Sequence, residues 1–130
     1  MSSLMNVVRS ALILGVLSFG AIACGAEYER TEITGVRVSN LGGEVSVQRI
    51  DVPEGLIVKA HIVVWNDDNE AMTLSVRAVD PNIVEVAGVV NDRDYAFIGK
   101  KQGRTAVQFL ADGKVVLTVQ ADVTAQPTLP

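Results

Sequence analysis

Apolar and polar residues alternate along most of the chain after residue 32. Between Leu56 and Trp65 every second residue is apolar, while Lys59 and His61 stand at positions between them. Successive side chains of a β-strand point to opposite faces of its sheet, so a period of two predicts a strand with one face on a core and one in water. The pattern predicts seven or eight short strands, in the segments Ile33–Ser39, Glu44–Ile50, Leu56–Trp65, Met72–Val79, Ile83–Ala87, Asp94–Gly99, Arg104–Ala111 and Lys114–Val123.

Turn-forming residues separate these segments. Asp112-Gly113 lies between two alternating apolar runs, which predicts a two-residue hairpin turn. Gly42-Gly43 predicts another turn, and the acidic stretch 65–71 predicts a hairpin loop. Because no segment after residue 32 has the 3.6-residue period of a helix, we expect an all-β fold, namely an immunoglobulin-like β-sandwich of antiparallel strands.

The beginning of the chain has a different composition. The run from Ala11 to Ala23 is apolar, has the length of the hydrophobic part of a secretory signal peptide, and is short for a membrane-spanning helix. It is followed by a polar stretch that ends near Glu32. We therefore divide the 130 residues into a signal peptide (1–23), a tether (24–32), a sandwich domain (33–124) and a tail (125–130).

The apolar run ends at Ala21-Ile22-Ala23-Cys24-Gly25, which resembles the lipobox of bacterial lipoproteins. In that family the cysteine carries diacylglycerol and becomes the first residue of the mature protein. The resemblance implies that Cys24, the single cysteine of the chain, is lipidated and holds the protein to a membrane by acyl chains such as palmitate. Since Gly25 stands where an aspartate would resemble an inner-membrane retention signal, it also implies sorting to an outer membrane. The alternatives are an ordinary signal peptide cut near Ala23 and an uncleaved anchor.

Charge and composition exclude some kinds of partner. When Arg9 of the signal segment is left out, ten of the 11 basic residues remain, against 15 acidic residues. Aromatic residues make up 5% of the chain. Nucleic-acid binding needs clustered basic residues and stacking rings, so we expect no nucleic-acid partner. Three residues lie between Gly99 and Gly103, which Arg104 follows, whereas a P-loop has four residues between its glycines and then lysine. We interpret this stretch as a corner between strands and expect neither a nucleotide nor another cofactor.

Two family resemblances involve the second half of the chain. Asp80, Pro81, Ile83 and Val86, followed by Gly99, Gly103, Thr105, Val107 and Phe109, resemble the pattern of bacterial immunoglobulin-like domains of the BIG2 type, over roughly residues 33–123. The stretch from Asp80 through Gly99–Thr105 to Asp112-Gly113-Lys114 is similar to the N-terminal domain of pilus-formation secretins. The second resemblance implies an accessory role in a pilus or secretion channel.

No group of residues in the sequence indicates catalysis. His61 is the single histidine, and the alternation places it beside Lys59 on a water-facing surface. A triad would need a nucleophile and a base in contact, which the sequence does not offer. The carboxylates Asp67, Asp68 and Glu70, and separately Asp92 and Asp94, lack the spacing of an EF-hand, and we interpret them as solvated turns rather than calcium ligands.

Trp65 is the one candidate contact residue. Strict alternation would place it on the outer face, where an indole beside an acidic loop could contact a partner. A bulge near Val63 would instead turn it into the core or the end of the sandwich, and we expect this second arrangement.

These features predict a lipid-anchored, non-enzymatic module of a bacterial cell envelope that contacts a protein or an envelope component. The alternative is a lipidated accessory of a pilus or secretin-type assembly.

Overall fold

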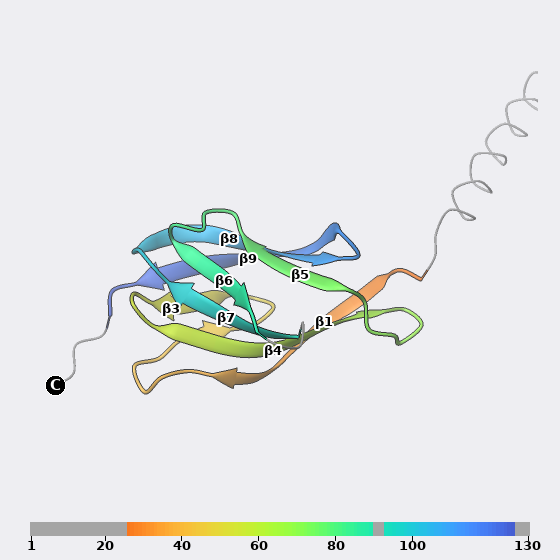
Figure 1. The fold of residues 1–130 in the computed structure, drawn as a ribbon, viewed down its shortest axis with the longest axis horizontal. Helices are drawn as coiled ribbons and strands as arrows, with labels where there is room; N and C mark the ends of the chain where they lie inside the picture. The colour runs from red at the N-terminus through yellow and green to blue at the C-terminus, as the bar shows by residue number, and fades with distance from the viewer. Residues whose placement is uncertain (1–25, 90–92, 127–130) are drawn as a thin grey trace, which may run out of the picture.

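The computed structural model describes residues 26–89 and 93–126, which form two β-sheets packed face to face (Figure 1). In the order β1-β4-β7-β6, the four-stranded sheet contains β1 (Tyr28–Arg37), β4 (Ile57–Asn66), β7 (Asp94–Gly99) and β6 (Val84–Gly88). In the order β2-β3-β9-β8-β5, the five-stranded sheet contains β2 (Glu44–Val45), β3 (Ile50–Pro53), β9 (Lys114–Thr124), β8 (Gly103–Ala111) and β5 (Leu74–Ala78). The predicted all-β sandwich is confirmed.

The core lies between the sheets and is made by the predicted apolar positions. On β4 the side chains of Val58, Ala60, Ile62 and Val64 are all buried, as the alternation predicted. Phe97 of β7 and Phe109 of β8 are fully buried and contribute the largest side chains. Each sheet therefore keeps its second face for solvent, and these two outer faces carry the polar residues.

The described strands number nine rather than seven or eight, because the predicted segment Glu44–Ile50 holds only β2 and a turn, and the additional strand β3 begins at its last residue. The Ser46 hydroxyl accepts hydrogen bonds from the amides of Gln48 and Arg49 and donates one to the carbonyl of Arg49. Hydroxyls of this kind stabilise turns at the expense of a strand. The chain reverses there, and β3 then runs parallel to β9, whereas the prediction had antiparallel strands throughout.

Residues 28–32, expected in the tether, belong to β1. Their partners are on β4, where Arg30 pairs with Trp65 and Thr31 with Val64. The folded domain thus begins at Tyr28 rather than at residue 33. The predicted signal peptide, Cys24 and Gly25 lie outside the described residues, as does the part of the tail from residue 127 onward.

Two of the predicted turns have different outcomes. The hairpin at Asp112-Gly113 is confirmed: Ala111 pairs with Lys114, and both turn residues have positive φ, 50° and 84°. The loop 66–71 does not join a hairpin of neighbouring strands, because β4 and β5 belong to different sheets. Gly99 and Gly103 flank the connection from β7 to β8, as predicted for a corner between strands.

The two ends of the described chain lie at opposite ends of the sandwich. In Figure 1 the start of β1, in orange, and the loop 66–71 lie at one end, and the chain leaves β9 at the other. Between residues 26 and 126, leaving aside residues 90–92, no helix has the length and apolar composition to cross a membrane.

Candidate interaction surfaces

A row of charges crosses the outer face of the five-stranded sheet. The strand register aligns Glu44 on β2 with Asp51 on β3, Asp51 with Asp122 on β9, and Asp122 with Arg104 on β8. We call these four residues the charge row. Three of them are acidic, and parallel pairing of β3 with β9 places two aspartates side by side.

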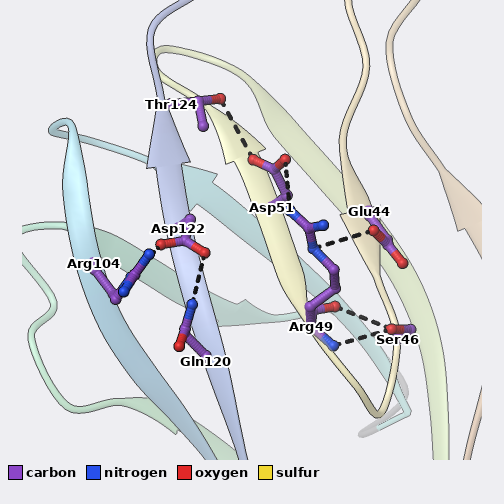
Figure 2. Close-up of polar contacts among 8 residues, drawn as sticks. All are labelled: Glu44, Ser46, Arg49, Asp51, Arg104, Gln120, Asp122 and Thr124. Carbon is purple, nitrogen blue, oxygen red and sulfur yellow. Dashed lines mark hydrogen bonds and ion pairs between the residues drawn. The ribbon is translucent and has the colours of Figure 1, made fainter.

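Hydrogen bonds and ion pairs compensate these carboxylates, as Figure 2 shows. Arg104 Nε donates to Asp122 Oδ1 over 2.8 Å, and Gln120 Nε2 donates to Asp122 Oδ2 over 3.1 Å. Arg49, which precedes β3, lies 3.5 Å from both Glu44 Oε2 and Asp51 Oδ2. The hydrogen bond from Arg104, and then that from Gln120, lowers the pKa of Asp122. Each of the three carboxylates in the charge row therefore has a side-chain hydrogen-bond or ion-pair partner.

Trp65 lies on the outer face of the four-stranded sheet, and the bulge expected near Val63 is absent. Burial alternates without interruption along β4, and Trp65 is half-buried between the fully covered Val64 and the buried Asn66. Arg30, its partner on β1, holds its guanidinium carbon 5.3 Å from the centre of the indole ring. This is the distance of a cation–π contact, which covers part of the ring.

The Arg30 guanidinium is also bound by carboxylates. Its NH1 lies 2.6 Å from Glu29 Oε2 and its Nε 3.1 Å from Glu32 Oε1, and the hydrogen bond with Glu32 raises the pKa of Arg30. The same bond is the main cause that lowers the pKa of Glu32, followed by the indole of Trp65. The indole Nε1 nevertheless makes no hydrogen bond of acceptable geometry within the described residues, although it is covered.

The acidic loop beside Trp65 is closed by its own hydrogen bonds. Asn66 Oδ1 accepts from the amides of Asp68 and Glu70, and Asp67 Oδ1 accepts from the amide of Glu27. Across the parts of the chain that the structure describes, no three His, Cys, Asp or Glu residues are placed to hold a metal ion. Asp92, named in the sequence with Asp94 as a candidate calcium ligand, lies outside the described residues.

A groove of about 320 Å³ lies on the same outer face, further along β1 and β4. The residues that line it include Gly35, Arg37, Lys59, His61, Val89 and Asp94. His61 is on the outer face, as predicted, and its Nδ1 lies 2.9 Å from Asp94 Oδ1. Thr34 is opposite His61 on β1, so a threonine, a histidine and an aspartate share one row.

That row lacks an activated nucleophile. Within the described residues the Thr34 hydroxyl makes no hydrogen bond with His61, and a nucleophile needs such a bond to lose its proton. The sequence reasoning overlooked the groove, because Arg37 and Lys59 meet only through the register of β1 with β4. The register of two segments separated by turns was not predictable from either one.

No protein-family model matches the chain, and no curated protein matches it. Similar folds occur among solved domains of the S-layer protein SbsC. Domains 4 and 5 superpose with a TM-score of 0.50 and 15% identity, over 74% of this chain and 54% of that one. The structure of domains 1–6 gives 0.57 and 14%, over 81% and 14%, and that of domains 4–9 gives 0.53 and 15%, over 78% and 15%.

This chain thus spans about half the length of the first of these structures and about a seventh of the other two. Identities of this size show a likeness of fold. The resemblances to BIG2 domains, to secretin domains and to the lipobox stay predictions.

Proposed function

We propose that the protein is a lipid-anchored, non-enzymatic module of a bacterial cell envelope, in which an acylated Cys24 holds an immunoglobulin-like sandwich against a membrane. One observation carries the proposal: β1 begins at Tyr28, four residues after Cys24. A lipid on that cysteine would therefore hold the folded domain close to the membrane surface.

The short connection determines how such a domain would be presented. Four extended residues span about 13 Å, against about 30 Å for the nine-residue tether expected from the sequence. The end of the sandwich with Trp65 and the loop 66–71 would then lie next to the membrane surface. The opposite end, where the chain leaves β9, would face away from it (Figure 1). Several acyl chains on one residue, at about 0.8 kcal/mol per buried CH₂, would make this attachment stable.

The likeness to S-layer domains supports a structural role at the cell surface. Those proteins are named for surface layers, and the shared fold extends over most of this chain. The ion pairs of the charge row and of Arg30 lie on open sheet faces. Sites of acid–base catalysis instead need groups converging around a substrate.

Metabolic labelling of the full chain with an alkyne analogue of palmitate, followed by membrane fractionation, tests the anchor. We expect the unaltered protein to carry the label and to sediment with membranes, and Cys24→Ala to lose the label and to become soluble. Gly25→Ala, which keeps the cysteine, is the matched control. Label or membrane retention in processed Cys24→Ala would refute lipid attachment.

Two further measurements address location and partners. Gly25→Asp should move the protein from the outer to the inner membrane if the resemblance to sorted lipoproteins holds. Purification of the lipidated protein in mild detergent, followed by mass spectrometry, should recover envelope components. Recovery of secretin or pilus subunits would favour the accessory function instead.

A further inference from the structure

Two positive charges face each other on the outer face of the four-stranded sheet. The register pairs Arg37 of β1 directly with Lys59 of β4, and both residues are exposed. Like charges at directly opposite positions of an antiparallel pair destabilise the sheet. Within the described residues neither side chain takes part in an ion pair.

The groove beside this pair has room for a ligand. Gly35 belongs to the stretch between Thr34 and Arg37 where the register of β1 shifts, and its φ is 58°. A Cβ added there would lie 3.9 Å from His61 Cβ, so glycine keeps the space above the histidine open. The resulting volume of about 320 Å³ is enough for a small anionic group with part of the molecule that carries it.

The charges around the groove favour an anion. Arg37 and Lys59 contribute two positive charges, and Asp94 is the carboxylate among the lining residues. Asp94 Oδ1 is hydrogen-bonded to His61 Nδ1 and keeps its one negative charge, so the two cations give the lining an excess of one positive charge, leaving His61 aside. This local excess of positive charge stands on a protein with a net charge of −4.

We propose that the groove binds the phosphate or carboxylate groups of a linear anionic polymer, held by Arg37 and Lys59. The polymer is favoured because Arg37 lies on the edge strand β1, so a long chain can cross the groove and continue past the sheet edge. Arginine can bind such a group through two parallel hydrogen bonds, and lysine adds a point charge. The inference gives the proposed module a chemical class of ligand, and the site itself does not depend on the Cys24 anchor.

NMR titration of the full chain in detergent tests the site, with three probes: inorganic phosphate, linear polyphosphate and polygalacturonate. We expect the amides of Gly35, Arg37 and Lys59 to shift, and at least one polymer to bind more tightly per charged group than inorganic phosphate. Shifts confined to other residues, or none with any probe, would refute the site. Equal affinity per charge for the free ion and both polymers would refute the polymer as ligand.

Substitutions separate binding from structure. Lys59→Gln should weaken binding about tenfold, as expected when a charged hydrogen-bond donor is lost. The same change relieves the repulsion with Arg37, so the free protein should melt at a slightly higher temperature, while the added polymer no longer raises the melting temperature. Lys114→Gln, an exposed lysine of the five-stranded sheet, makes the same charge change and should alter neither property. A lower melting temperature of Lys59→Gln, or unchanged binding, would contradict the proposal.

Discussion

The outer faces of the two sheets are both rich in charge, yet the charges are arranged differently. On the five-stranded sheet, Asp122 receives hydrogen bonds from Arg104 and Gln120, and its acidic neighbours on β2 and β3 share Arg49. On the four-stranded sheet, Arg37 faces Lys59 with no ion pair to either within the described residues. Charge alone therefore does not distinguish a stabilising face from a binding face.

The difference follows from which strands are neighbours. Opposite charges in adjacent strands contribute modestly to stability, whereas like charges cost a similar amount unless something binds between them. A face whose charges are satisfied internally has little to offer a charged partner. The unsatisfied pair beside the groove retains its attraction for anions, and this is why we assign binding to that face.

The largest effect should come from the place where the two sheets meet. A Cβ added to Gly99 of β7 would lie 2.5 Å from the carbonyl oxygen of Pro53 on β3. Because that oxygen belongs to the backbone, it cannot move away as the end of a side chain could. We expect Gly99→Ala to lower the free energy of unfolding by about 1–3 kcal/mol, which destabilises both sheets together. Gly88→Ala on β6 is the control, because its added Cβ would make an ordinary contact 3.9 Å from Tyr95. Equal urea midpoints for the two variants would contradict the expectation that the close contact of Gly99 with Pro53 requires a glycine.

A smaller effect is expected from breaking the charge row. Asp122→Asn should lower the free energy of unfolding at pH 7 by at most about 1 kcal/mol, because Arg104 is largely exposed and solvent screens the pair. The pKa of Asp122 lies below its ordinary value of 3.8, so the carboxylate stabilises the fold above that value and the contribution is lost as the pH falls through the folded pKa. The gap between the two proteins should therefore close in acid.

Urea unfolding at a series of pH values measures that gap. Asp68→Asn, in the exposed acidic loop, provides the control, because it removes a carboxylate that takes part in no ion pair within the described residues. A gap that persists unchanged at pH 3 would show that the carboxylate charge of Asp122 contributes nothing.

The smallest effect is expected at the paired end of the four-stranded sheet. Replacing Arg30 by Gln removes the cation over the half-buried Trp65 and the bonds to the partly exposed Glu29 and Glu32. We expect a loss of stability smaller than that of Asp122→Asn and a change in the fluorescence of the single tryptophan. A double-mutant cycle with Trp65→Leu should show coupling between the two side chains. Strict additivity would mean that the cation–π contact is energetically silent.

Sequence and structure agree where the alternation along one strand or a turn dipeptide carries the information. The alternation along β4 predicted its buried face residue by residue, and Asp112-Gly113 predicted its hairpin. The same alternation, followed without a bulge, places Trp65 outside, so the error there came from expecting an interruption that the strand does not have. The turn at Ser46 was missed because its hydroxyl acts on amides within three residues, which overrides the apolar pattern of the segment.

The sequence by itself determined that this chain is an all-β sandwich and which side chains of β4 face its core, because these follow from side chains alternating along one strand at a time. Only the tertiary structure decided that β3 runs parallel to β9, that β1 begins at Tyr28, and that Arg37 stands opposite Lys59. Pairing joins segments that are distant in the chain, and a shift of one residue in register turns every side chain to the other face. The groove and the charge row are products of that register.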